Sequence, residues 1–188
     1  MLNELELIQE LRKGNEPAFK YLVETYQDRV FNTAIGIVQN AEDAEDVAQE
    51  VFIQVFRSIH SFKAESKLST WIYRITTTRA LDHLRSRKSK KRFGLIQRLF
   101  GDGNKPLFEL PDFHHPGVTL DRKENAARLF RAIDRLRGNQ KTAFILHKLE
   151  DLSYIEISAV MQISLSAVES LMHRAKQNLR KMLEKETE

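Results

Sequence analysis

Two short helices joined by a tight turn are indicated over residues 153–182. The first begins with Ser153 and Glu156 at the spacing of a capping box, in which each side chain satisfies a backbone N–H of the first turn. After Gln162 and Ile163, Ser164 is a good N-cap for a longer second helix. The apolar residues of that helix recur at three- and four-residue steps, as in Leu165, Val168, Met172, Ala175, Leu179 and Met182. The segment therefore predicts a helix-turn-helix.

The opposite face of the second helix carries side chains of the types that reach base edges and phosphates in a DNA major groove. They are Ser166, Glu169, Ser170, His173, Arg174, Gln177 and Lys181. An ordinary helical hairpin with a solvated face would account for the same segment. DNA binding is thus one of two interpretations of this segment taken alone.

Helical periodicity also fills the first 88 residues. A helix over 2–13 is expected to stop at Gly14, and Pro17 opens a second helix that ends near Asn40. A third is expected over 43–59 and a fourth over about 69–87, each with an apolar stripe. Four helices with short connections predict a compact bundle. The expected fold class is all-α, with two small helical domains joined by a linker.

The composition excludes several classes of protein. The chain has 188 residues, and no run approaches the ~18 apolar residues of a membrane span, so we expect no membrane insertion. The N-terminal segment is acidic where a signal peptide would be basic. A cytoplasmic protein is therefore expected, and the absence of cysteine agrees with that compartment while removing disulfides and thiolate metal sites.

Enzyme signatures are missing from the sequence. It contains no Gly-rich phosphate loop, no nucleophile elbow and no zinc-hydrolase pair. His114 and His115 are adjacent, without cysteine or the four-residue helical spacing of a metal-binding pair. We therefore expect no catalytic role, no metal and no cofactor.

Charge is distributed unevenly along the chain. It sums to about −3 over residues 1–80, about +6 over 81–105 and about +1 over the rest. Residues 89–120, rich in glycine and proline, are expected to form a flexible basic linker. The linker contains an amphipathic run formed by Phe93, Leu95, Ile96, Leu99 and Phe100. We expect this run to dock on a protein partner, with a membrane surface as the alternative.

The third helix has a dense polar face, formed by Asp43, Asp46, Gln49, Glu50 and Gln54. Acidic residues in a first turn are favoured by the helix dipole, which explains Asp43 and partly Asp46. The dipole does not explain why the polar face continues to Gln54. A protein-binding face is the competing interpretation.

The fourth helix and the loop before it are expected to expose aromatic rings interleaved with cations and hydroxyls. The set comprises Lys63, Lys67, Ser69, Thr70, Trp71, Tyr73, Arg74, Thr77, Thr78, Arg79 and Arg85. Such a surface suits single-stranded DNA, whose bases stack on rings while cations neutralise the backbone. Trp71 taken alone is more typical of a core residue than of a stacking platform.

Three blocks in this order resemble the extracytoplasmic-function (ECF) subfamily of bacterial sigma factors. The blocks are DAEDVAQEVFIQVFRSI, SKLSTWIYRITTTRALDHLRSR and LSYIEISAVMQISLSAVESLMHRAKQNLRK. The resemblance covers most of the chain except the linker. It implies a region-two domain over residues 1–88, the linker over 89–120 and a region-four domain over 121–188.

The resemblance also implies a role for each surface. The polar face of the third helix would bind the clamp of the largest subunit of core RNA polymerase. The loop and fourth helix would open the −10 element and hold its bases, as base capture requires, with Asp82 and Arg87 beside Arg79 and Arg85 at the upstream duplex. The helix after Ser164 would read the −35 element. An anti-sigma factor is a further partner that the family commonly has.

Departures from the family pattern are found at three positions. Thr78 stands where many members have asparagine, Glu169 where a basic residue is common, and Leu171 where arginine is common. Because Glu169 can accept a hydrogen bond from a cytosine amino group, a shifted −35 preference is expected rather than lost binding.

Two other functions remain as alternatives. One is a stand-alone helix-turn-helix regulator that binds duplex DNA as a dimer, and the other is a helical adaptor that only sequesters a partner. The first 88 residues argue against the regulator, which needs neither the acidic face nor the aromatic and basic surface. The cationic side chains of Arg174, Lys176, Arg180 and Lys181 argue against the adaptor.

Overall fold

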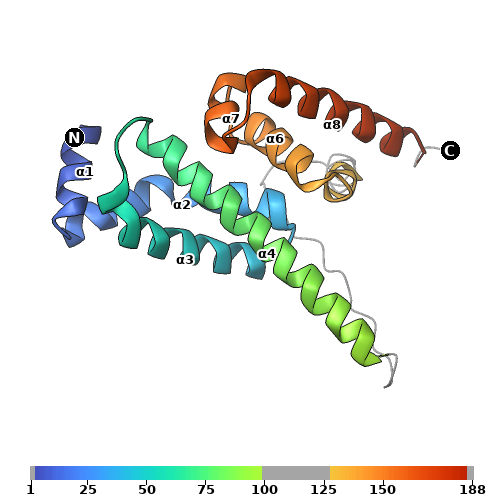
Figure 1. Ribbon diagram of the computed structural model, residues 1–188, viewed down its shortest axis with the longest axis horizontal. Coiled ribbons are helices and arrows are strands. Elements are labelled where there is room, and N and C mark those ends of the chain that lie inside the picture. Colours follow the sequence, from blue (N-terminus) through green and yellow to red (C-terminus); the bar gives the residue numbers. More distant parts are fainter. Residues whose placement is uncertain (1–2, 99–127, 186–188) are drawn as a thin grey trace, which may run out of the picture.

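The computed structural model describes residues 3–98 and 128–185, with the side chains of 88–98 left aside. In the N-terminal part, α1 spans Glu4–Arg12, α2 spans Glu16–Val38, α3 spans Ala41–Ser58 and α4 spans Leu68–Arg98. A short 3-10 turn, η1, covers Ile59–Ser61. In the C-terminal part residues 128–134 are helical, followed by α6 (Gly138–Lys148), α7 (Tyr154–Met161) and α8 (Leu165–Lys185). The described residues contain no strand, and the all-α expectation is confirmed (Figure 1).

Asparagine side chains start the first three helices. Asn3 forms a capping box with Glu6 at the start of α1. The side-chain oxygen of Asn15 accepts from the backbone N–H of Ala18, and that of Asn40 accepts from the N–H of Asp43. Each contact satisfies a backbone donor that has no partner within its helix, so the starts of these helices are decided locally.

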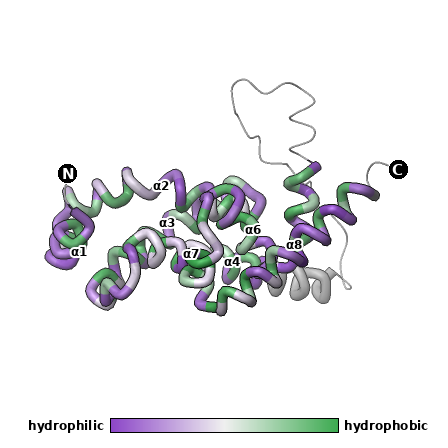
Figure 2. Tube along the Cα trace, turned by 90° about the horizontal axis from the view of Figure 1, so that it is seen from above, coloured by the Kyte–Doolittle hydropathy of each residue, from purple (hydrophilic) through white to green (hydrophobic). Residues whose placement is uncertain are grey.

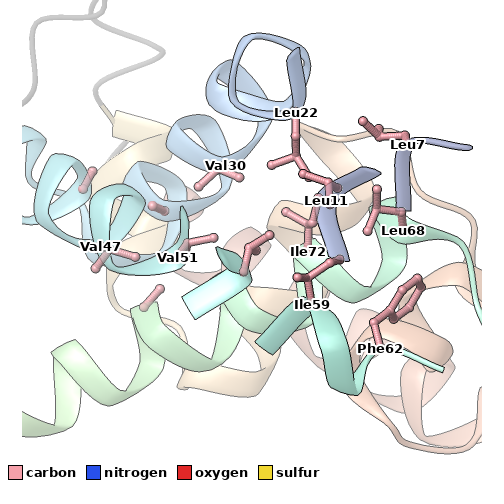
Figure 3. Packing of buried hydrophobic residues seen from close by; sticks show 14 of the residues in the cluster. Leu7, Leu11, Leu22, Val30, Val47, Val51, Ile59, Phe62, Leu68 and Ile72 are labelled. Atoms are coloured by element: carbon pink, nitrogen blue, oxygen red, sulfur yellow. The ribbon is translucent and has the colours of Figure 1, made fainter. Parts of the chain in front are cut away.

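The apolar stripes of α1 to α4 meet in one core. Leu22, Val30, Val47 and Val51 from α2 and α3 are fully buried there, and Ile72 of α4 is almost so (Figure 3). Figure 2 shows hydrophilic and hydrophobic residues alternating along the helices, as amphipathic packing requires. The predicted four-helix bundle is therefore present.

The helix-turn-helix is formed as expected. Ser153 and Glu156 make both hydrogen bonds of the capping box at the start of α7. Gln162 ends α7 in a left-handed conformation, and the hydroxyl of Ser164 accepts from the N–H of Ala167 at the start of α8. Val168 lies on the buried face of α8.

Within the described ranges no single helix is long and apolar enough to cross a bilayer. The pair α7 and α8 meets the length and composition criteria only together, and it is bent by 105°. This bend is the turn of the helix-turn-helix.

Helix α4 is longer than expected. Its backbone remains helical to Arg98, so the first ten residues assigned to the linker, 89–98, belong to a helix. Phe93, Leu95 and Ile96 lie on this extension, whereas Leu99 and Phe100 fall outside the described residues, as do His114 and His115. The charged run after Arg87 is compatible with a helix because lysine and arginine are good helix formers.

The two helical units are packed against each other. Helix α7 contacts α4, and α6 contacts α2. The helices α6, α7 and α8 gather beside α4 on the side away from α3 (Figure 1).

Candidate polymerase and nucleic-acid interfaces

The polar face predicted on α3 contains two kinds of residue: some are exposed to solvent, and others are half-buried and bonded to α4. Asp46, Gln49 and Glu50 are exposed. Asp43 and Gln54 are only half-buried but are bonded to α4: Asp43 pairs with Arg87 at 2.6 Å, and the side-chain oxygen of Gln54 accepts from Arg79 at 2.7 Å. Two of the five predicted residues therefore connect α3 to α4.

Exposed apolar residues continue the same surface and were not predicted as part of it. Ile53 is 49% exposed and Phe56 is 54% exposed. The positions 46, 49, 53 and 56 follow each other at three- and four-residue steps, so the apolar pair extends the stripe of Asp46 and Gln49. The three- and four-residue spacing could have revealed this extension, but it does not by itself distinguish an exposed apolar residue from a buried one.

A groove of about 670 Å³ separates the exposed α3 surface from α4. Its walls carry carboxylates from α3, including Asp46 and Glu50, and the cations Arg79 and Arg87 from α4. The structure thus places the predicted polymerase-binding and upstream −10 residues on the two sides of one groove.

The predicted −10 surface is only partly exposed. Lys63, Lys67, Thr78 and Arg85 face solvent, and Ser69, Trp71, Arg74 and Arg79 are half-buried. Contrary to expectation, Thr70 (8%), Tyr73 (5%) and Thr77 (4%) are buried. The expectation of a fully exposed surface was wrong because it treated α4 as the outer wall of an isolated bundle.

Residues of the C-terminal unit cover Tyr73 and Arg74. The Tyr73 hydroxyl donates to the Glu150 carboxylate at 2.7 Å, and Arg74 donates to the backbone carbonyl of Ala159 at 2.8 Å. Burial and the adjacent Glu150 raise the pKa of the Tyr73 hydroxyl. Tyr73 therefore remains a neutral hydrogen-bond donor in this arrangement.

Trp71 has the core packing that the sequence favoured for it. It packs partly against the N-terminal core and stacks on Phe62, with ring centroids 4.9 Å apart and planes inclined at 29°. Part of its surface remains accessible. The packing is the expected core role, and stacking of the accessible part on a base stays a prediction.

All seven predicted −35 residues share the solvent-exposed face of α8. These are Ser166, Glu169, Ser170, His173, Arg174, Gln177 and Lys181. The opposite face is buried through Val168, Met172, Ala175 and Leu179. Among the described helices, α8 makes its main contacts with α6 and α7, and none of its main contacts is with α1 to α4.

Acidic and histidine side chains do not gather into a metal site in the part of the chain that is described. Nε2 of His83 lies 3.0 Å from Oδ1 of Asp43, and the other oxygen of that carboxylate pairs with Arg87. The cluster around Asp43 thus connects α3 to α4.

Two family regions match the two helical units. Residues 22–90 match Sigma-70 region 2, and residues 126–179 match Sigma-70, region 4. The chain is 31% identical over 179 residues to the RNA polymerase sigma-H factor of Pseudomonas aeruginosa, covering 95% of this chain and 93% of that protein. It is also 31% identical over 178 residues to the ECF RNA polymerase sigma factor SigW of Bacillus subtilis, covering 94% of each.

Solved structures share the fold. One shows CnrH in complex with the cytosolic domain of CnrY, with a TM-score of 0.67, 20% identity and 95% of each chain covered. Another shows the sigma factor RpoE with the anti-sigma factor NepR from Bartonella quintana, with a TM-score of 0.67, 21% identity, 88% of this chain and 96% of that chain covered. Since both family regions and near-full-length relatives agree with the helices described above, the chain belongs to the ECF subfamily of sigma factors, which direct RNA polymerase to promoters.

Proposed function

We propose that this sigma factor reads the −35 element through the exposed face of α8. The observation that carries the proposal is the placement of all seven predicted residues on one solvent-exposed stripe of a helix-turn-helix. Arg174 and Lys181 would contact phosphates, and Ser170 and Glu169 can reach base edges when the helix lies in a major groove. Glu169 accepts hydrogen bonds only, so a cytosine amino group is its best partner.

Core RNA polymerase would bind the outer surface of α3. Asp46, Gln49 and Glu50 supply charge and hydrogen-bonding groups, while Ile53 and Phe56 supply apolar area. Exposed apolar side chains next to polar ones are typical of protein interfaces. Asp43 and Gln54 would support this surface from behind by tying α3 to α4.

The −10 element would be captured by α4 and its preceding loop. Lys63 and Lys67 can neutralise the strand, and Trp71 and Tyr73 can stack on unpaired bases. Arg79, Arg85 and Arg87 lie farther along α4, where they would contact the upstream duplex through phosphates. Strand opening by capture uses binding energy alone, so the protein would act as an initiation factor without catalysing a reaction.

An anti-sigma factor would regulate this activity in the cytoplasm, where polymerase works. The support is the fold shared with the RpoE of Bartonella quintana, which was solved with an anti-sigma factor. A partner that covers the α3 stripe would compete directly with polymerase. Ile53 and Phe56 are the exposed apolar residues that such a partner would bury.

Run-off transcription with purified core polymerase on a pool of promoter fragments tests the proposal. Wild type is compared with the double variant Asp46→Ala/Gln49→Ala. The matched control is Glu24→Ala/Gln27→Ala, because these exposed residues have the same chemistry and spacing on α2. We expect transcripts that require the wild-type protein, that weaken about tenfold or more in the α3 variant and that persist in the control.

The alternative outcome is clearly different. Specific duplex binding without any protein-dependent initiation would indicate a stand-alone regulator. Equal losses in both double variants would show that the α3 surface is not the polymerase site.

A further inference from the structure

The two helical units meet where side chains of one unit pack directly on glycine backbone of the other. A Cβ atom at Gly36 of α2 would lie 2.8 Å from Cγ2 of Ile145 and 3.2 Å from Cδ1 of Leu149. A Cβ atom at Gly138 would lie 3.2 Å from Cδ2 of Leu81 on α4. Glycine inside a helix is unfavourable, so its presence at Gly36 is explained by the close approach of α6.

Polar contacts join the units on both sides of this close approach. Lys141 of α6 is 3% exposed, and its ammonium lies 2.7 Å from the Asp134 carboxylate and 3.3 Å from the carbonyl oxygen of Ile37. That carbonyl is in the last turn of α2, where the helix dipole favours a cation. On the other side, Tyr73 and Arg74 of α4 bond to Glu150 and to the carbonyl of Ala159.

Tyr73 is packed as a member of the C-terminal core. Its ring joins the cluster of Ala143, Leu146, Ile157, Val160, Val168 and Met172. An aromatic side chain that fills another unit's core cannot stack on a DNA base at the same time. One nitrogen of the Arg74 guanidinium is likewise engaged by the carbonyl of Ala159 in α7, which leaves fewer of its donors for a phosphate.

The contact is incompletely satisfied, unlike a permanent core. Among the described side chains at this contact, Nε of Arg74 is buried without a hydrogen-bond partner. Buried polar atoms without partners weaken an interface. The contact thus combines close packing at Gly36 with an unsatisfied buried donor at Arg74, which lowers the free energy needed to separate the two units.

From these observations we propose that docking of the C-terminal unit onto α2 and α4 is an autoinhibitory contact. It occupies Tyr73 and part of Arg74, so the free protein captures single-stranded DNA only weakly, while the α8 face remains open to duplex DNA. Polymerase binding must be accompanied by undocking before the −10 element is held. The proposal rests on the assignment of Tyr73 and Arg74 to the −10 surface.

Gly36→Gln in the full-length chain tests the proposal. The added side chain would point at Ile145 and Leu149 and cannot be accommodated while the units are docked, whereas glutamine favours the α2 helix more than glycine does. Gly36→Ala adds only a methyl group at the same place and should separate the units less. Asn32→Ala is the matched control, since Asn32 is exposed on α2 one turn before Gly36.

Two readouts are needed for each variant. Small-angle X-ray scattering reports the radius of gyration, and fluorescence anisotropy reports the affinity for a labelled mixed-sequence single-stranded 12-mer and for a mixed-sequence duplex. For Gly36→Gln we expect a larger radius of gyration and about tenfold tighter binding of the single strand. The reason is that a larger fraction of the protein would be undocked and able to bind the strand. Duplex affinity should stay within about twofold, and Asn32→Ala should match wild type.

Opposite results overturn the proposal. An unchanged radius in Gly36→Gln means that the docked arrangement is not the state in solution. A larger radius with unchanged single-strand affinity means that docking masks nothing. Normal run-off transcription in either case would leave the sigma-factor assignment intact, whereas absent wild-type transcription would contradict that assignment independently.

A second variant acts from the other side of the contact. Glu150→Ala removes the acceptor of the Tyr73 hydroxyl without changing the N-terminal bundle. If circular dichroism shows that Gly36→Gln has lost helix, Glu150→Ala decides the question by the same two readouts. Wild-type single-strand affinity in a folded, expanded Glu150→Ala protein would refute the proposal.

Discussion

Asp43 Oδ2 lies 2.6 Å from a guanidinium nitrogen of Arg87, and Oδ1 of the same carboxylate lies 3.0 Å from Nε2 of His83. This one side chain of α3 is thereby tied to two residues of α4, 40 and 44 positions away. Asp46, three residues later, is exposed. Two neighbouring aspartates that look equivalent in sequence therefore differ in structural role.

Asp43→Asn should lower stability, and Asp46→Asn should lower polymerase affinity. For Asp43 we expect a loss of about 1 kcal/mol, the usual scale of a partly exposed ion pair, and a Tm lower by about 2–4 °C. Thermal unfolding and core-polymerase binding should be measured for both variants. If Asp43→Asn weakened polymerase binding without a change in Tm, the assignment of Asp43 to stability and of Asp46 to polymerase binding would be wrong.

The titration of the Glu150 carboxyl should appear in the pH dependence of the free energy of unfolding. Burial raises the pKa of its carboxyl above the ordinary value of 4.5, although Tyr73 and Arg29 act in the opposite direction and Asp151 adds to the rise. A raised pKa means that the folded state binds the proton more tightly than the unfolded state. This contribution is therefore largest below pH 4.5 and is lost as the pH rises through the raised pKa.

Glu150→Gln removes this titration while keeping the shape of the side chain. Urea unfolding should be followed from about pH 4.5 to about pH 7.5, and the wild-type value compared with the variant at each pH. We expect wild type to lose stability relative to the variant as the pH rises. A constant difference over the whole range would show that Glu150 does not titrate there.

Glu169→Lys should increase duplex affinity and reduce −35 selectivity. The substitution replaces an acceptor with a cation that can reach one more phosphate, so the slope of log K against log salt should steepen by about 1. Glu184→Lys is the control, because Glu184 is also exposed on α8 but lies outside the predicted −35 set. Unchanged promoter preference in Glu169→Lys would count against base contact by Glu169.

Lys141 should contribute more to stability than an exposed lysine of the same helix. Lys141→Ala removes the contacts to Asp134 and to the carbonyl of Ile37, and we expect a loss of about 1–3 kcal/mol. Lys141→Met should lose less because its apolar chain still packs. Urea unfolding is the measurement, and Lys148→Ala, exposed on α6, is the control. Equal effects of Lys141→Ala and Lys148→Ala would contradict the expectation.

Local signals in the sequence predicted the helices and the exposed face of α8 well. The capping boxes and N-caps at Ser153 and Ser164 involve residues three positions apart, so the sequence contains both partners of each contact. The stripe on α8 likewise follows from helical periodicity alone. The end of α4 was placed too early because lysine and arginine were interpreted as a solvated linker when they also favour a helix.

The sequence by itself determined the class of the fold, the order of the helices and the residues on each helical face, because backbone hydrogen bonding and periodicity act over a few residues. Only the tertiary structure decided that Asp43 pairs with Arg87 of α4 and that Tyr73 packs in the C-terminal core. It also decided that the side chain of Ile145 packs against Gly36. The contact between Tyr73 and Glu150 spans 77 positions. Periodicity shows which face of a helix is buried, but the partner that buries it depends on how separate units pack, and no local pattern of residues encodes that choice.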